Sequence, residues 1–117
     1  MNFLKKIRVA VPTNGDKGLE DTVSEVFSRA NTFTIVDLEE KKIKDVKVLR
    51  NSALDYKSGV GPIVIKMLAD SNVNVVLAGE IGPGATTLLE QNKIEKIKVE
   101  PGITVAEAIK NAGLVKD

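Results

Sequence analysis

Residues 76–91 read VLAGEIGPGATTLLEQ, and this stretch decides the fold. An apolar run rich in strand-forming residues stops at Gly79, a turn follows, and apolar residues then recur at helical spacing. A strand, a tight turn and a helix in this order are typical of α/β proteins. The turn can be ordinary chain geometry or the floor of a binding site, because glycine permits both a sharp bend and close approach to the backbone.

The patterns on either side predict further strands and helices. Strands are expected at Ile7–Val11, ended by Pro12, and at 32–38, 43–50, 73–79 and 96–102. Helices are expected over 21–30, from residue 60, from residue 85 and from residue 105, where apolar residues recur every three or four positions. Thr22 with Glu25, and Thr104 with Glu107, have the spacing of capping boxes. The last residues, GLVKD, are expected to fray.

The order of these elements brings three loops together. The polar tip EEKK joins the strands 32–38 and 43–50 into a hairpin, so these two strands are antiparallel. Helical crossovers normally return the chain parallel to the preceding strand. The loops 12–21, 51–62 and 79–84 are therefore predicted at one edge of the sheet. Ligands of open α/β sheets bind beyond the carboxyl ends of the strands.

Composition excludes several classes of function. The chain has 117 residues, most simply one domain (1–117), with 28% charged residues and a net charge of +1. Such a balanced charge and an aromatic content of 3% argue against a nucleic-acid binder. No apolar run approaches the roughly 20 residues of a membrane span, and we expect no membrane contact and a cytoplasmic protein. The absence of Cys and His excludes disulfides, typical zinc sites and thiolate-held iron–sulfur clusters.

The loop GEIGPGAT is a candidate cradle for an anion. Backbone N–H groups at a helix start favour negative charge, and the segment SGVGP before residue 63 has the same character. The loop is neither a P-loop nor a G-x-G-x-x-G motif. The alternative is structural: Gly79 ends a strand, Gly82 turns the chain, and Gly84 lets helix and sheet pack closely. Local pattern alone leaves both interpretations open.

Acidic residues on the same loops suggest a second chemistry. Asp16, Asp55 and Glu80 would all lie at the predicted edge, so a metal-dependent phosphoester hydrolase is an alternative. The first strand, however, carries no acid that could complete such a site. Surface carboxylates are the ordinary explanation for these residues. We assign no catalytic residue and no metal ligand.

Five segments in order resemble the dinitrogenase iron–molybdenum cofactor biosynthesis family. They are IRVAVPTNG, VSEVFSRANTFTIVD, RNSALDYKSGVG, VNVVLAGEIGPGA and PGITVAEAI, which together span Ile7 to about Ala112. Phe27, Arg29 and Ala30 stand where that family has a Phe-Gly-Arg-Ala motif, with Ser28 in place of its glycine. The resemblance implies a ribonuclease H-like α/β fold, with a mixed five-stranded sheet of order 3-2-1-4-5 and helices on both faces.

The resemblance also implies a function. Relatives include nitrogenase cofactor carriers, so we expect a non-enzymatic binding protein for a small anionic ligand or a molybdenum- or iron-containing cluster. Without Cys or His the cluster would be held non-covalently, through backbone N–H groups, Arg29 and Lys57. The expected ligand-binding residues are Asn14, Arg29, Asn51, Gly59, Gly61, Gly79, Gly82 and Gly84. An alternative is a protein-interaction or regulatory module, as a monomer or a small homo-oligomer.

Overall fold

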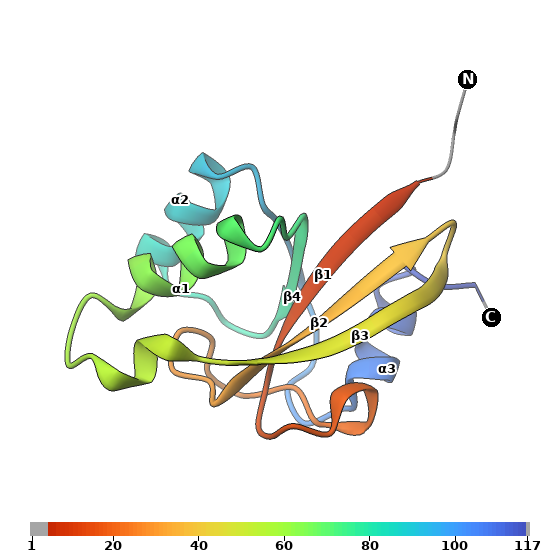
Figure 1. Cartoon of the computed structure of the whole chain (residues 1–117), viewed down its shortest axis with the longest axis horizontal. Helices are drawn as coiled ribbons and strands as arrows, with labels where there is room; N and C mark the ends of the chain where they lie inside the picture. The colour runs from red at the N-terminus through yellow and green to blue at the C-terminus, as the bar shows by residue number, and fades with distance from the viewer. Residues whose placement is uncertain (1–4, 117) are drawn as a thin grey trace.

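The computed structural model describes residues 5–116, and a five-stranded sheet forms its centre (Figure 1). The strands are β1 (Lys6–Thr13), β2 (Thr32–Glu39), β3 (Lys42–Arg50), β4 (Val75–Ala78) and β5 (Glu95–Lys98). Their order is β3-β2-β1-β4-β5. β2 is antiparallel to both of its neighbours, whereas β1, β4 and β5 pair in parallel. The predicted mixed sheet and its strand order are confirmed.

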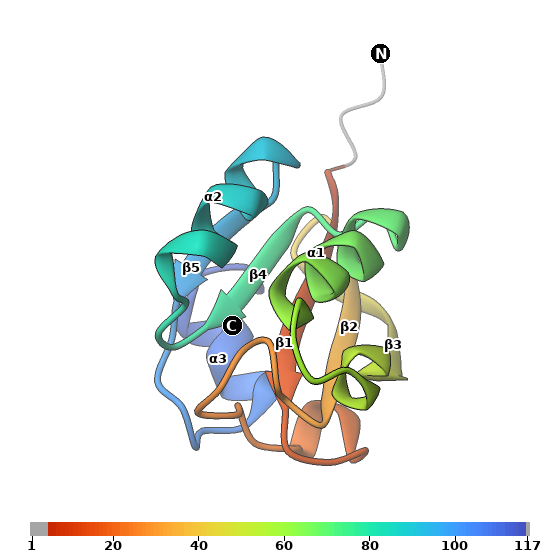
Figure 2. The same cartoon turned by 90° about the vertical axis from the view of Figure 1, so that its left-hand side faces the viewer.

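Helices cover both faces of this sheet, as expected. They are α1 (Val60–Asp70), α2 (Pro83–Gln91) and α3 (Val105–Asn111), with short 3-10 helices at Gly18–Glu20 and Ser52–Asp55. Figure 2 shows α1 and α2 on the near face and α3 behind the sheet. On the first face Phe33, Ile35, Val64 and Leu68 are buried together. On the second face Val9, Val36, Leu77 and Ile109 are buried together.

Local chemistry accounts for the elements that matter most. All four residues of β4 are buried, because the strand lies inside the sheet with helices on both sides. The hairpin between β2 and β3 turns at Glu40 and Lys41, which have φ values of 51° and 65°. Thr104 begins α3 as predicted, with its Oγ1 accepting a hydrogen bond from the Glu107 backbone N–H at 3.1 Å.

The predicted helix over 21–30 is wrong. The segment forms bends and isolated bridges, with Val23 paired to Thr13 and Thr22 paired to Thr104. Val23 is buried on the α3 face of the sheet, Phe27 is buried on the α1 face, and Val26 is 51% exposed. The segment therefore crosses the end of the sheet from one face to the other. Its apolar residues have helical spacing but serve opposite faces, so no helix can bury them together.

The two ends of the chain also differ from expectation. β1 continues through Pro12 to Thr13, because β4 pairs only with Val9 and Ala10 and leaves the Pro12 position without a parallel neighbour. The tail packs instead of fraying: Leu114 and Val115 contact the α3-side core, and the last residue, 117, lies outside the described residues. No helix within residues 5–116 has the length and apolarity needed to cross a bilayer.

Candidate functional site

The loops predicted to converge do meet at one edge of the sheet. β1, β3, β4 and β5 all point the same way, so the loops that follow them emerge at the same edge, which we call the carboxyl edge. The chain also enters β2 there, through residues 24–31. The loop after β5, residues 99–104, was not predicted to take part. It joins this edge through the hydrogen bond from the Gly102 N–H to the Val23 carbonyl, at 2.8 Å.

Asn51 holds two of these loops together. Its side chain is fully buried, and its Nδ2 donates to the carbonyls of Ser28 and Ala30, each at 2.8 Å. Its Oδ1 accepts from the Ala53 N–H at 2.9 Å. The amide therefore makes three hydrogen bonds to the backbone of these loops and joins the entry of β2 to the loop after β3.

Arg29 lies exposed between the loops. Its guanidinium donates to the carbonyls of Lys57 at 3.0 Å and Tyr56 at 3.4 Å. Two of its five N–H groups are engaged in this way, and the group is held in place with further donors able to meet an anion. The Arg29 position is therefore compatible with its predicted role, and the Lys57 carbonyl that it contacts lies on the loop that follows β3.

Asn14 is also part of the loop framework. Its Nδ2 donates to Thr22 Oγ1 at 2.8 Å, and its carbonyl accepts from Asn31 Nδ2 at 2.9 Å. These bonds fix the first loop against the entry to β2. The residue remains exposed, so it can line the edge as well as support it.

The predicted glycines fall into two groups. Gly59 requires glycine because its φ is +70°, and Gly79 requires it because an added Cβ would lie 2.8 Å from Pro101 Cγ. Gly82 and Gly84 have no atom within 4 Å of the Cβ position, and Gly61 has only an ordinary contact with Ser28 Oγ at 3.8 Å. The expected packing role of Gly84 between helix and sheet is therefore wrong. No residue within 5–116 blocks a Cβ at these three positions, although Gly82 is the N-cap of α2, where glycine is favoured over alanine.

The acidic residues do not assemble a metal site. Glu80 pairs with Lys98 at 2.9 Å and Asp55 with Arg50 at 3.5 Å, while Asp16 is exposed. Residues 5–116 contain no group of three acids placed to bind one metal ion. The metal site that the alternative hydrolase function would need from Asp16, Asp55 and Glu80 is therefore not formed among these residues.

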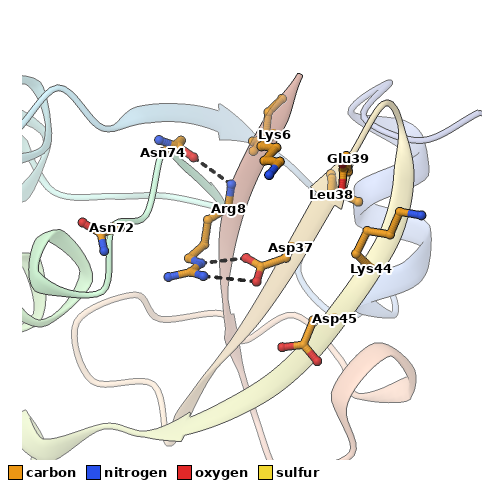
Figure 3. Close-up of a pocket in the computed structure, with 10 residues that line it drawn as sticks. Lys6, Arg8, Asp37, Leu38, Glu39, Lys44, Asp45, Asn72 and Asn74 are labelled. Atoms are coloured by element: carbon orange, nitrogen blue, oxygen red, sulfur yellow. Dashed lines mark hydrogen bonds and ion pairs between the residues drawn. The ribbon is translucent and has the colours of Figure 1, made fainter. Parts of the chain in front are cut away.

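A cavity of about 470 Å³ lies at the opposite end of the sheet from the carboxyl edge. Figure 3 shows Arg8 and Asp37 facing each other on its floor. The Arg8 Nε donates to Asp37 Oδ1 at 2.6 Å, and Arg8 NH1 donates to the Ser71 carbonyl, just after α1, at 2.7 Å. This hydrogen bond with Arg8 holds the pKa of Asp37 below its ordinary value. The charged groups on the cavity floor satisfy each other and tie α1 to β1 and β2.

Comparisons with known proteins agree with this geometry. The family model for dinitrogenase iron-molybdenum cofactor proteins matches residues 5–113. The apo form of the orange protein from Desulfovibrio gigas is 29% identical, with a TM-score of 0.81 over 93% of this chain and 90% of that one. A candidate NifB protein from Thermotoga is 34% identical, with a TM-score of 0.75 over 92% of this chain and 87% of that one.

A further relative is similar to this chain in sequence. An uncharacterised protein of Methanocaldococcus jannaschii is 28% identical over 107 residues, which are 92% of this chain and 86% of that protein. The matched region includes every loop of the carboxyl edge, since these loops lie between residues 13 and 104. The chain belongs to the dinitrogenase iron-molybdenum cofactor family.

Proposed function

We propose that this protein is a non-enzymatic carrier that holds an anionic ligand or a metal–sulfur cluster non-covalently at the carboxyl edge. The observation that carries the proposal is the presence of glycine at residues 61 and 84, where no described residue blocks the position of a Cβ. Both lie in the first turn of a helix, where alanine is more favourable than glycine. A ligand that approaches the backbone closely supplies the missing reason, because a Cβ would block it.

The donors at this edge suit a ligand that needs no coordinating side chain. The chain has no Cys or His, and residues 5–116 offer no acidic metal-binding group. Backbone N–H groups at residues 61 and 84 belong to first helical turns, whose N–H groups lack intrahelical partners. Together with the Arg29 guanidinium they would bind the outer atoms of an anionic cargo rather than its metal ions.

Family membership supports the same class of ligand. The family model is named for the iron-molybdenum cofactor of dinitrogenase, and the orange protein has a structure described as an apo form. The proposed contact residues are Arg29, Gly61, Gly82 and Gly84. Asn14, Asn51, Gly59 and Gly79 are proposed to shape the loops that present them.

NMR titration tests this function directly. Molybdate, tetrathiomolybdate and a reconstituted iron–sulfur species are added separately to ¹⁵N-labelled protein under anaerobic conditions. We expect saturable shifts in the amides of residues 28–30, 57–61 and 79–85, with little change at the opposite end of β2 and β3. Unchanged spectra with all three probes, at concentrations well above micromolar, would contradict the proposal.

Exposed apolar side chains favour a second function at the same edge. Val26 is 51% exposed and Tyr56 is 54% exposed, and both lie on the loops that flank Arg29. Tyrosine and arginine are enriched in protein–protein interfaces. We infer a docking role for a partner that delivers or receives the cargo. Replacing both side chains by serine should weaken transfer of the cargo to a partner extract while leaving binding of tetrathiomolybdate unchanged.

A further inference from the structure

A smaller cavity of about 190 Å³ opens between the loop after β4 and strand β5. Because a water molecule occupies about 30 Å³ in the liquid, the cavity has room for about six water-sized groups. A tetrahedral oxyanion, with five such atoms, fits within it. The cavity is lined by Ala78, Gly79, Glu80, Ile81, Lys96, Ile97 and Lys98.

Strand geometry places the side chains of Lys96 and Lys98 on the same side of β5. Ile97 packs into the core on the α3 face of the sheet. Because successive side chains of a strand point to opposite faces, Lys96 and Lys98 both point to the α2 face. Both lysines are exposed, so their charges are available to a ligand in the cavity.

A carboxylate of the chain is already paired with one of these two lysines. Glu80 Oε1 accepts a hydrogen bond from Lys98 Nζ at 2.9 Å. This bond is the main cause of the lowered pKa of Glu80, and the charge of Lys96 lowers the pKa further. The Glu80 and Lys98 side chains are 87% and 75% exposed, so water and ions reach the pair freely. An exposed ion pair is readily exchanged for a competing anion.

We propose that this cavity is a subsite for a tetrahedral dianion, bound by Lys96 and Lys98, and that Glu80 is an internal competitor for it. The two lysines carry two positive charges, and Glu80 neutralises one of them. A dianion that displaces Glu80 neutralises both, which favours dianions over monoanions. The inference rests on the proposed function, because it assigns a ligand class to the Gly79 loop of the same edge.

The test is a titration of the full chain with sodium molybdate at fixed, low ionic strength, followed by the amide shifts of residues 79–82 and 96–98. Glu80→Gln should lower the Kd and Lys98→Gln should raise it, each by about tenfold, the effect of one unit charge some 6 Å from a dianion in a water-like dielectric. Sodium nitrate, a monoanion, should bind more weakly than molybdate to the wild type.

Matched controls are Glu90→Gln on α2 and Lys93→Gln after it, which make the same charge changes outside the cavity lining. Equal effects of Glu80→Gln and Glu90→Gln would overturn the subsite, because they would show a general charge effect. If tetrathiomolybdate shifts residues 57–61 but none of the cavity variants alters molybdate binding, the subsite alone fails. If no probe shifts any loop of the carboxyl edge, the proposed function fails with it.

Discussion

Replacing Gly84 by alanine should stabilise the protein and weaken its ligand binding. Gly84 is the second residue of α2, and the Cβ of an alanine there would meet nothing within 4 Å. Its φ lies outside the left-handed region, so alanine fits without strain. Alanine also restricts the unfolded chain more than glycine does. We therefore expect the free energy of unfolding to rise by about 0.5–1 kcal/mol.

The assay compares urea unfolding of the two ligand-free proteins by far-UV circular dichroism. For a chain of this size the gain corresponds to a rise in Tm of about 2–5 °C. Tetrathiomolybdate binding to the variant should weaken by at least about tenfold, or about 1.4 kcal/mol, because the new methyl group occupies the space in which a ligand would meet the backbone.

Thr87→Ala is the matched control, since Thr87 is exposed on the same helix one turn further on. It should leave the affinity for tetrathiomolybdate unchanged. A destabilised Gly84→Ala variant would show that glycine is needed inside the protein after all. A more stable variant that binds as tightly as the wild type would refute the link between this glycine and the ligand.

Four further substitutions at three positions test the framework of the fold. Gly79→Ala should destabilise the protein by about 1–3 kcal/mol in urea unfolding, because its Cβ would lie 2.8 Å from Pro101; an unchanged midpoint would contradict this. Asn51→Ala should lower the free energy of unfolding by about 3 kcal/mol, because the buried backbone groups that bond to its amide would lose their partner. Asn51→Asp should recover little of this stability, because a carboxylate lacks both N–H donors. Equal stability of the wild type and the alanine variant would disprove this role. Asp37→Asn should lower the free energy of unfolding at pH 7 by about 1–2 kcal/mol, measured by urea unfolding, because it removes the ion pair with Arg8. Because the folded-state pKa of Asp37 lies below its ordinary 3.8, the stability contributed by its charge is complete above about pH 5 and is lost as the pH falls through the folded-state pKa. A stability difference between wild type and variant that stays constant down to pH 2 would refute this prediction.

The sequence predicts the sheet well because its strands differ clearly in pattern. The fully apolar β4, the hairpin tip at 40–41 and the Thr104 cap are each set by local chemistry, and the structure has them as predicted. The same reasoning gives a wrong prediction for the segment 21–30. Helical spacing describes only the order of apolar residues along the chain, and here Val23 and Phe27 are buried on opposite faces of the sheet.

The candidate site is less predictable than the fold, for a related reason. The sequence places glycines at a strand end and at helix starts but does not show what lies across from each Cβ position. Pro101 is 22 residues from Gly79 in sequence, and only the folded chain brings them together. Lys96 and Lys98 likewise look like ordinary exposed residues of an edge strand. The pairing of Lys98 with Glu80 depends on the parallel register of β4 and β5.

The bend at residues 79–84 serves chain geometry and the proposed site through different residues. Gly79 is required by the fold, since it admits Pro101 from the loop after β5, and a variant there should lose stability before it loses binding. Gly84 is not required by the fold, and a variant there should lose binding without losing stability. Gly82 is the N-cap of α2, where glycine is already favoured over alanine. A bend that served chain geometry alone would not need glycine at residue 84. The contrast between Gly79→Ala and Gly84→Ala therefore separates the two roles within a single turn of six residues.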